Sequence, residues 1–405
     1  MKNLLRLLMA VAWVPAMAAA QEFQYSNAWN VEPYSQAGFP QYVPDAYSQG
    51  VYGQPDHGLI STQPGEGIPA AYGYPEASYA PVAACEGDNC GHCCPSRCST
   101  GRCLHRSGIF SEFLYWKASG ADVSYGVPQD GIGGIGTVPV GDVGVLDFDH
   151  EASFRVGFNL ALNCQSSVSV AYTKFETNTD HVLFIPPPFV IQPLVMAPGT
   201  FNAGFTAQVA VAETSLEMDS LDVEYRAVLT SCSKYHVNFL AGARYAELDQ
   251  SLGSVFLFAP PDGTTFVFSE LDFEGAGLRI GLDGERFILP RMGISVYGKA
   301  VGGVLGGEFR GTYAQINQFN GTEAFTTWED ARLVPIGEAE VGFRWANRRD
   351  SLRLSVGYYV GMWGNMVTTP EWIEAVQGLN FVDISRDSSD SIRFDGLVAR
   401  AELRL

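Results

Sequence analysis

From residue 108 to the end of the chain, apolar and polar side chains alternate in many short segments. The clearest is the last one, residues 392–405. Every second residue back from Leu405 to Leu397 is apolar, and the residues between them include two arginines and a glutamate. A period of two residues is typical of a β-strand with one apolar and one polar face. Such strands suit a wall between lipid and a polar lumen, and only a closed barrel satisfies strand backbones in lipid. The pattern therefore predicts an all-β fold, a transmembrane antiparallel β-barrel.

Ten segments share this alternation. They are residues 109–118, 152–163, 167–177, about 208–229, 235–248, 266–282, 293–312, 336–345, 351–362 and 392–405. The links after the even-numbered segments are short, and those after the odd-numbered ones are mostly longer. Outer-membrane barrels alternate periplasmic turns and outer loops in this way, so we expect about ten strands with both ends in the periplasm. Residues 201–212 could form a separate strand, giving twelve. A soluble sandwich also alternates, but it does not need polar faces with Arg and Glu beside Gly.

The polar faces of these strands carry the charged side chains that would point into the barrel. We predict that the pore is lined by Arg155, Asp222, Glu224, Arg226, Arg244, Arg279, Lys299, Glu338, Glu340, Arg344, Arg353, Arg400, Glu402 and Arg404. Basic groups outnumber acidic ones in this set, nine to five, although the whole chain has a formal net charge of −19. A barrel of about eight strands is just filled by side chains, and unpaired charge in a narrow lumen is costly. We therefore expect a constricted pore crossed by arginine–carboxylate pairs, with a mild preference for anions.

The first 107 residues differ from the strand region. Residues 1–20 have the features of a secretory signal peptide: Lys2 and Arg6, a short apolar core, and small residues before the cleavage site. Residues 21–84 are rich in Tyr, Pro, Gln and Gly and lack periodicity, so they cannot bury a core and are expected to be disordered. This periplasmic segment is either a plain linker or a spacer that contacts an envelope partner.

Residues 85–107 hold six of the eight cysteines. The disulfide candidates are Cys85, Cys90, Cys93, Cys94, Cys98 and Cys103. Such density in an exported protein indicates disulfides, although the sequence does not choose among the pairings. The alternative is a zinc site around Cys90 and Cys93 with two nearby histidines, but the spacing fits no usual structural zinc site. We expect no bound metal.

Composition and motifs argue against several other functions. The negative charge argues against nucleic-acid binding, and no later apolar run reaches the roughly 18 residues of a membrane helix. Residues 131–136 match the dinucleotide fingerprint by letter, but no strand clearly leads in and no helix follows. His150 and His181, in predicted outer loops, lack a recognised hydrolase arrangement. The acidic residues between Asp383 and Asp390 lack the spacing of a calcium loop. We expect no cofactor and no enzymatic activity.

Several strand fragments, taken in chain order, resemble one family. They are FSEFLYW at residues 110–116, LDVEY at 221–225, AGARYAEL at 241–248, FEGAGL at 273–278, and residues 337–344 followed by the VGYY strand at 356–359. Together they resemble the Legionella-type major outer membrane protein family of pore-forming outer-membrane barrels. The resemblance covers about residues 108–405. It implies a bacterial outer-membrane location and porin-like activity.

The leading functional hypothesis is passive diffusion of small hydrophilic solutes through a barrel surrounded by outer-membrane lipids. The alternative is a plugged structural or adhesive envelope protein with a barrel anchor. An outer-membrane hydrolase is a weaker alternative. The first two hypotheses differ in whether the lumen is open.

Overall fold

The computed structural model describes residues 104–130, 138–186, 188–203, 207–232, 234–258, 263–378 and 390–405. The expected signal peptide, the segment 21–84 and the cysteines from Cys85 to Cys103 lie outside these residues. So do the glycine-rich motif at 131–136 and the acidic stretch up to residue 389. What the sequence predicts for these parts stays a prediction.

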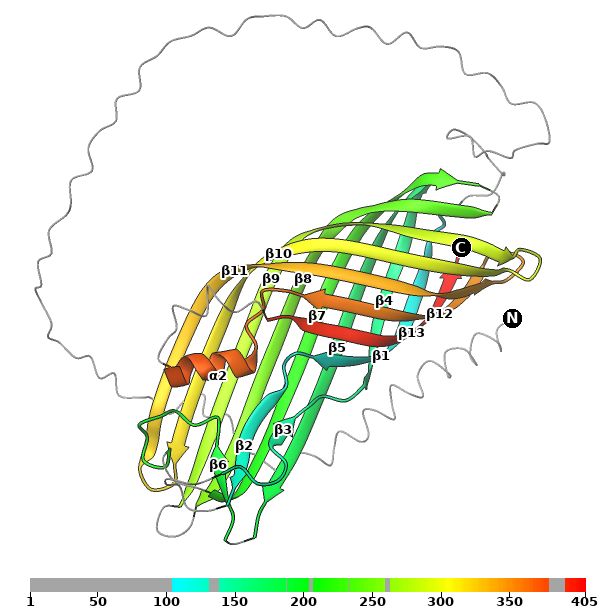
Figure 1. The fold of residues 1–405 in the computed structure, drawn as a ribbon. Helices are drawn as coiled ribbons and strands as arrows, with labels where there is room; N and C mark the ends of the chain where they lie inside the picture. The colour runs from blue at the N-terminus through cyan, green and yellow to red at the C-terminus, as the bar shows by residue number, and fades with distance from the viewer. Residues whose placement is uncertain are drawn as a thin grey trace, which may run out of the picture. The chain divides into compact units, whose positions relative to one another are not determined.

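Ten strands form a closed antiparallel ring (Figure 1). They are β1 (Gly108–Ser119), β4 (Glu151–Asn163), β5 (Ser166–Phe184), β7 (Ala207–Ser231), β8 (Tyr235–Phe258), β9 (Thr264–Leu289), β10 (Ile294–Asn317), β11 (Gly321–Ala346), β12 (Leu352–Trp363) and β13 (Ile392–Arg404). Each pairs with its neighbours in this order, and β1 pairs with β13 to close the ring. The ten-stranded barrel predicted from the sequence is confirmed.

Five consecutive strands, β7 to β11, are long; the sequence predicts β7 and β10 nearly in full but underestimates β8, β9 and β11. Each has 24 to 26 residues, about twice the length of β1 or β13. For example, β11 begins at Gly321 instead of residue 336. The alternative in which residues 201–212 form a separate strand is wrong. The pairing of β5 with β7 continues without a break from Val209 to Ala227, so the region from residue 207 is the start of β7.

Short elements lie at the outer end of the ring. They are β2 (Val123–Gln129), β3 (Gly144–Leu146), β6 (Val190–Pro193) and α2 (Thr369–Gly378). β2 pairs with β3 and β6, and β6 joins the ring where Ile191 pairs with Ala207 at the start of β7. Helix α2 contacts β2, β8, β9 and β10 (Figure 1). Among the described residues, no helix is long and apolar enough to cross a membrane.

Tight turns gather at the other end of the ring. Two to five residues connect β4 to β5, β7 to β8, β9 to β10 and β11 to β12. Gly293 in the β9–β10 turn has a φ of 74°, and a Cβ atom there would lie 2.1 Å from the carbonyl oxygen of Ala346. Glycine is therefore required at this turn. The start of β1 and the end of β13 also meet here, where Gly108 pairs with Arg404. This is the periplasmic end.

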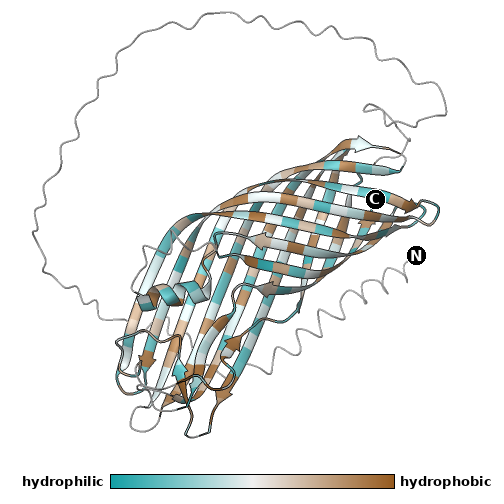
Figure 2. Cartoon of the chain, in the orientation of Figure 1, coloured by the Kyte–Doolittle hydropathy of each residue, from teal (hydrophilic) through white to brown (hydrophobic). Residues whose placement is uncertain are grey.

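Apolar and polar residues alternate along the strands of the ring (Figure 2), and the exposed apolar side chains form a band on its outside. Leu278 and Ile280 on β9 are 75% and 63% exposed. Tyrosines mark the outer border of the band, where the Tyr245 hydroxyl donates a hydrogen bond to Glu274 at 2.8 Å. Beyond this border the outward side chains of β7, β8 and β9 include eight carboxylates: Glu213, Glu217, Asp219, Glu247, Asp249, Glu270, Asp272 and Glu274. The lipid band therefore covers only the periplasmic half of the long strands.

We expect Ile280→Arg to destabilise the barrel by about 2–4 kcal/mol, because Ile280 faces lipid near the middle of the apolar band. Ile288, at the periplasmic end of the same strand, is also exposed. The same change there should cost at most about 1 kcal/mol. Urea unfolding of the protein refolded in lipid vesicles measures both losses. Equal losses would contradict this placement of the lipid band.

Candidate functional site

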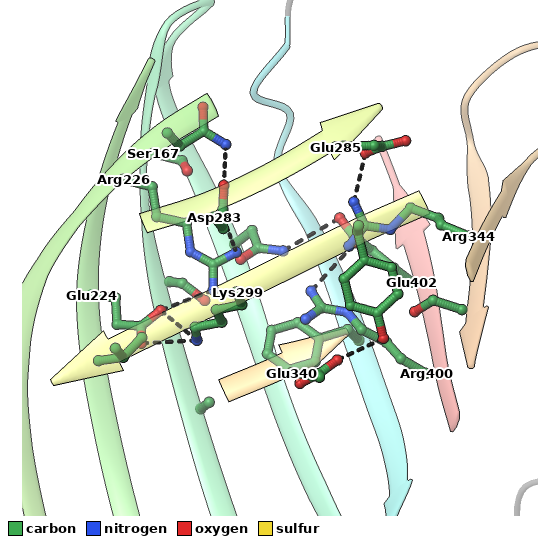
Figure 3. A pocket seen from close by; sticks show the side chains of 18 of the residues that line it. Ser167, Glu224, Arg226, Asp283, Glu285, Lys299, Glu340, Arg344, Arg400 and Glu402 are labelled. Carbon is green, nitrogen blue, oxygen red and sulfur yellow. Dashed lines mark hydrogen bonds and ion pairs between the residues drawn. The ribbon is translucent and has the colours of Figure 1, made fainter. Parts of the chain in front are cut away.

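Charged side chains fill the ring interior near its periplasmic end. All fourteen side chains that the sequence predicts to face inward surround one cavity of about 120 Å³ (Figure 3). The two-residue period of the strands brings them together, because every second side chain points to the same side of the sheet. Because all of these charged side chains line the same cavity, we take this cavity as the candidate functional site.

Two arginines and two carboxylates form the centre of the network. Arg244 donates two hydrogen bonds to the Asp222 carboxylate, one from Nε at 2.6 Å and one from Nη2 at 2.8 Å. Its Nη1 donates to Glu338 at 2.5 Å. Arg279 contacts the same two carboxylates at 2.5 and 2.6 Å. These side chains are at most 8% exposed. Two-pronged arginine–carboxylate pairs are among the strongest and most directional hydrogen bonds in proteins.

Strand register and glycines place this centre. Asp222 on β7 lies directly opposite Arg244 on β8, so pairing of the two strands brings the two side chains together. Arg279 on β9 lies between Gly242 on β8 and Gly303 on β10. Neither glycine has a side chain, so the Arg279 guanidinium has room to extend into the lumen. The local sequence therefore encodes the geometry of the central pair.

A second group surrounds Glu224. It accepts hydrogen bonds from Arg226 at 2.9 Å and from Lys299 at 3.1 Å (Figure 3). Glu340 makes a hydrogen bond with a neutral partner, the Tyr297 hydroxyl, at 2.6 Å. Most of the predicted inward charges are thus paired, some on the same or a neighbouring strand and some, such as Lys299 with Glu224, between strands that are not neighbours.

A third group links the first and last strands of the ring. Glu112 on β1 lies between Arg155 at 2.9 Å and Arg400 at 3.1 Å. Arg400 also contacts Glu402 at 3.3 Å, and Arg404 contacts Glu402 at the same distance. These contacts join β1, β4 and β13 from the inside, at the point where the ring closes.

Sequence reasoning missed several charged groups in the lining. Glu112, Asp283, Glu285 and Arg106 also line the cavity, and Glu285 pairs with Arg344 at 2.6 Å. On β9, Asp283 and Glu285 continue the two-residue period past residue 282, where the predicted strand ended. The complete lining has ten Lys or Arg residues and eight carboxylates. The nine-to-five basic excess is therefore largely compensated, and a preference for anions loses most of its support.

The segment before β1 crosses the periplasmic mouth of the cavity. The backbone N–H groups of Leu104 and His105 donate to the carbonyl of Cys164, at 3.2 and 3.4 Å. The His105 ring is buried, with Nδ1 2.7 Å from the Ser167 hydroxyl. Arg404 donates to the Leu104 carbonyl at 2.7 Å. The last residues of the predicted cysteine-rich segment therefore form a floor under the lumen.

Above the charged network the interior becomes apolar. Trp116 stacks on Tyr359 with ring centroids 4.3 Å apart, and the Arg155 guanidinium lies 5.4 Å from the Trp116 centroid. The charged and apolar regions meet at this stack. From there to α2 most inward side chains are apolar, although Arg332 and Gln250 are also buried there. We call the following side chains the apolar layer: Leu114, Trp116, Phe175, Leu216, Leu248, Leu252, Phe256, Leu271, Phe273, Leu305, Phe309, Val334, Trp363 and Phe394. All of them are buried.

Helix α2 covers the outer side of the apolar layer. Trp372 and Ile373 are buried in it, and the Trp372 ring lies 5.7 Å from that of Trp328. A Cβ atom at Gly311 on β10 would lie 3.0 Å from the Trp372 ring, so this strand makes room for the indole. Burial of this apolar face attaches the helix to the inside of the long strands.

Side-chain amides tie both ends of α2 to the barrel. Gln250 on β8 donates to the Val367 carbonyl at 3.0 Å, just before the helix. Gln377 near its end donates to the Met196 carbonyl at 3.1 Å. Sequence reasoning did not find this helix, which lies in a predicted outer loop.

The two histidines considered for hydrolysis lie apart from the charged cavity. The His150 ring stacks on Tyr115 with centroids 5.3 Å apart. Nδ1 of His181 lies 2.6 Å from the Tyr125 hydroxyl. Each of the two histidines thus lies next to a tyrosine.

Comparison with protein families agrees with the barrel. The family model described as "Legionella pneumophila major outer membrane protein precursor" matches residues 108–401. The chain belongs to this family. The match spans the ring, and the family together with the barrel places the protein in the outer membrane. No curated protein matches the chain.

Solved outer-membrane barrels resemble this family member only distantly. The outer membrane protease OmpT of Escherichia coli is 11% identical, with 74% of this chain and 97% of that chain covered and a TM-score of 0.40. A major outer membrane protein from Thermus thermophilus is 10% identical, with 74% and 100% covered and a TM-score of 0.29. The P. putida toluene transporter TodX is 7% identical, with 75% and 90% covered and a TM-score of 0.23. Scores this low carry no argument about activity.

We expect Arg244→Ala to destabilise the barrel by about 3–5 kcal/mol, because it leaves buried Asp222 and Glu338 with less compensating charge. Arg310→Ala is the matched control, since its pair with Glu308 is exposed on the outer surface. The control should cost less than about 1 kcal/mol. Urea unfolding in vesicles compares them. Similar losses would show that the central pair contributes no more than a surface pair.

The seating of α2 should weaken as pH rises. Burial raises the pKa of Glu371 to about 7, and nearby Asp390 adds to the rise. When α2 is packed inside the barrel, the protonated form of the Glu371 carboxyl is favoured. Its contribution is therefore complete below the ordinary pKa of 4.5 and is lost as pH rises through about 7.

Hydrogen exchange tests this pH dependence. Protection of the amides in residues 366–378 should fall between about pH 5 and pH 8, after correction for intrinsic exchange. Glu371→Gln keeps an uncharged side chain at the position that accepts a hydrogen bond from the Thr368 N–H, so its protection should change less with pH. The same pH dependence in both proteins would rule out Glu371 as its origin.

Proposed function

We propose that this protein is a closed barrel that anchors envelope-facing parts of the chain in the outer membrane, and that it is not an open pore. The observation that carries the proposal is the apolar layer between the charged network and α2. A hydrophilic solute would have to give up its water to cross this layer. Moving an amide or hydroxyl out of water without a new hydrogen bond costs roughly 2–7 kcal/mol.

Aromatic side chains from separate parts of the ring meet inside this layer. A chain of ring contacts runs through Trp116 on β1, Phe175 on β5, Phe394 on β13, Trp363 on β12 and Phe273 on β9. Successive ring centroids lie 5.5 to 6.5 Å apart. Three of the four contacts connect strands that are not neighbours in the sheet, and the fourth joins the paired strands β12 and β13. This supports a sealed interior.

In this proposal the functional contacts are made outside the lumen. The outer loops would face the surroundings of the cell, and residues 21–107 would face the periplasm and an envelope partner there. The floor formed by residues 104–106 attaches the N-terminal part of the chain directly to the barrel. A barrel with this arrangement holds both sets of contacts at a fixed place in the envelope.

Passive diffusion of small hydrophilic solutes is the second candidate, and the polar cavity favours it. Its lining of ten basic and eight acidic groups suits water and small ions. Diffusion through the whole barrel would require the apolar layer and α2 to move aside. The two candidates therefore differ in one measurable property, the conductance of the resting barrel.

Single-channel recording in planar bilayers separates the candidates. We expect the wild-type protein to insert without discrete conductance steps, because ions do not cross the apolar layer. A variant with Trp116, Trp363 and Phe394 changed to alanine should conduct, since these changes remove three rings from inside the lumen. The matched control changes Phe113, Phe154 and Phe158, which are 45% to 50% exposed on the lipid side. Heat-modifiable migration and β-rich circular dichroism confirm that each variant is folded.

Regular conductance steps from the wild-type protein would overturn the closed-barrel proposal and favour diffusion. In that case, reversal potentials in a salt gradient should show weak ion selectivity, because the charges of the lining nearly balance. Conductance from the lipid-side control but not from the lumen variant would contradict both candidates.

A further inference from the structure

Six basic side chains make no ion pair with any residue that the structure describes. They are Arg106, Lys234, Arg286, Arg291, Arg348 and Arg349, and all lie at the periplasmic end. Every other described Lys or Arg lies within 4.0 Å of a carboxylate. Within the described part of an acidic chain, basic groups without an acidic partner thus gather at one end of the barrel.

Five of the six lie on or next to three consecutive periplasmic turns, β7–β8, β9–β10 and β11–β12. The Phe287 N–H donates to the Lys234 carbonyl at 2.9 Å, which joins the first turn to the second. β10 pairs with β11, which joins the second to the third. Arg106 donates to the Arg349 carbonyl at 3.3 Å. We call these six residues the basic arc.

Nearby carboxylates do not neutralise the basic arc. Asp350, on the β11–β12 turn, is already held by Arg353 and Arg404, each at 2.7 Å. Glu285 points into the lumen, where it pairs with Arg344. Lys234, Arg286, Arg291, Arg348 and Arg349 are exposed. The arc therefore presents a positive surface.

Apolar side chains stand beside the basic ones. In the stretch from Arg286 through Arg291, Ile288 and Leu289 are 52% and 47% exposed, and adjacent Met292 is 62% exposed. Apolar groups beside basic ones are typical of a membrane surface, where the apolar groups reach acyl chains and the cations lie among headgroups. The position of the arc at the edge of the lipid band fits the same surface.

We propose that the basic arc binds the phosphate groups of anionic phospholipids in the periplasm-facing leaflet of the outer membrane. Basic residues at a membrane surface attract such lipids. The exposed apolar neighbours favour a lipid over the carboxylates of the cell wall. They also favour it over the chain's own residues 21–96, which contain eight acidic residues and no Lys or Arg. The inference holds whether the lumen is open or closed.

Tryptophan quenching tests the proposal in the full-length protein. Trp345, near the end of β11, is 40% exposed on the lipid side and serves as the reporter. The probe is phosphatidylglycerol with brominated acyl chains, mixed with unlabelled phosphatidylcholine. A second sample, in which only the phosphatidylcholine is brominated, gives the quenching by the bulk lipid for comparison. At low salt we expect several-fold enrichment of phosphatidylglycerol around the barrel, decreasing as salt screens the charges.

Two triple variants distinguish an effect of the basic arc from an effect of the protein's overall charge. Arg291→Gln, Arg348→Gln and Arg349→Gln together should bring the enrichment close to the bulk fraction. Lys174→Gln, Arg310→Gln and Arg393→Gln remove the same charge from paired residues of the outer half and should leave the enrichment unchanged. Heat-modifiable migration confirms that both variants are folded.

Four results would overturn the proposal. The first is a wild-type protein with no enrichment, and the second is equal enrichment in the two triple variants. The third is enrichment that appears only after the eight carboxylates between residues 22 and 88 are changed to amides, which would make the N-terminal segment the occupant of the arc. Binding to isolated cell-wall sacculi that the arc variant alone loses, without any lipid enrichment, would assign the arc to the cell wall.

Discussion

The structure depends on one constraint: every strand backbone that lies in lipid must find its hydrogen-bond partners within the sheet. A closed ring satisfies this requirement, and pairing of β1 with β13 completes it. Ten strands enclose a narrow interior, so inward side chains from opposite walls reach one another. The contact of Arg244 on β8 with Glu338 on β11 follows from this narrow cross-section. Filling of the lumen is therefore a consequence of closing a small ring with large side chains.

The interior is divided by polarity along the barrel axis. Ion pairs occupy the periplasmic half, where an isolated buried charge would be costly and most groups pair with one of opposite sign. The stack of Trp116 on Tyr359, with Arg155 over the indole, forms the boundary. Beyond it, apolar side chains pack against one another and against α2. The two halves use different interactions: ion pairs surround a cavity of about 120 Å³ in the first, and apolar side chains pack in the second.

The sequence predicts the number of strands and the inward charges because the two-residue period is clear within the lipid band. It does not show where the band ends. On β7, Leu221 and Val223 face lipid, whereas Leu216 and Met218 face inward and Glu217 faces outward. The two-residue period is unchanged along β7. Beyond the tyrosines, however, the apolar side chains face inward and polar side chains face outward. Strand ends were also predicted too early, which hid Asp283 and Glu285. Helix α2 depends on a cavity built by distant strands, so local sequence could not reveal it.

The apolar layer has a consequence for the cell as well as for the molecule. An outer membrane works as a permeability barrier, and each open channel adds leakage in proportion to its copy number. A barrel sealed by packed aromatic rings adds none. If the barrel is closed as we propose, the protein can be present at high density in the envelope without making the membrane more permeable to toxic solutes.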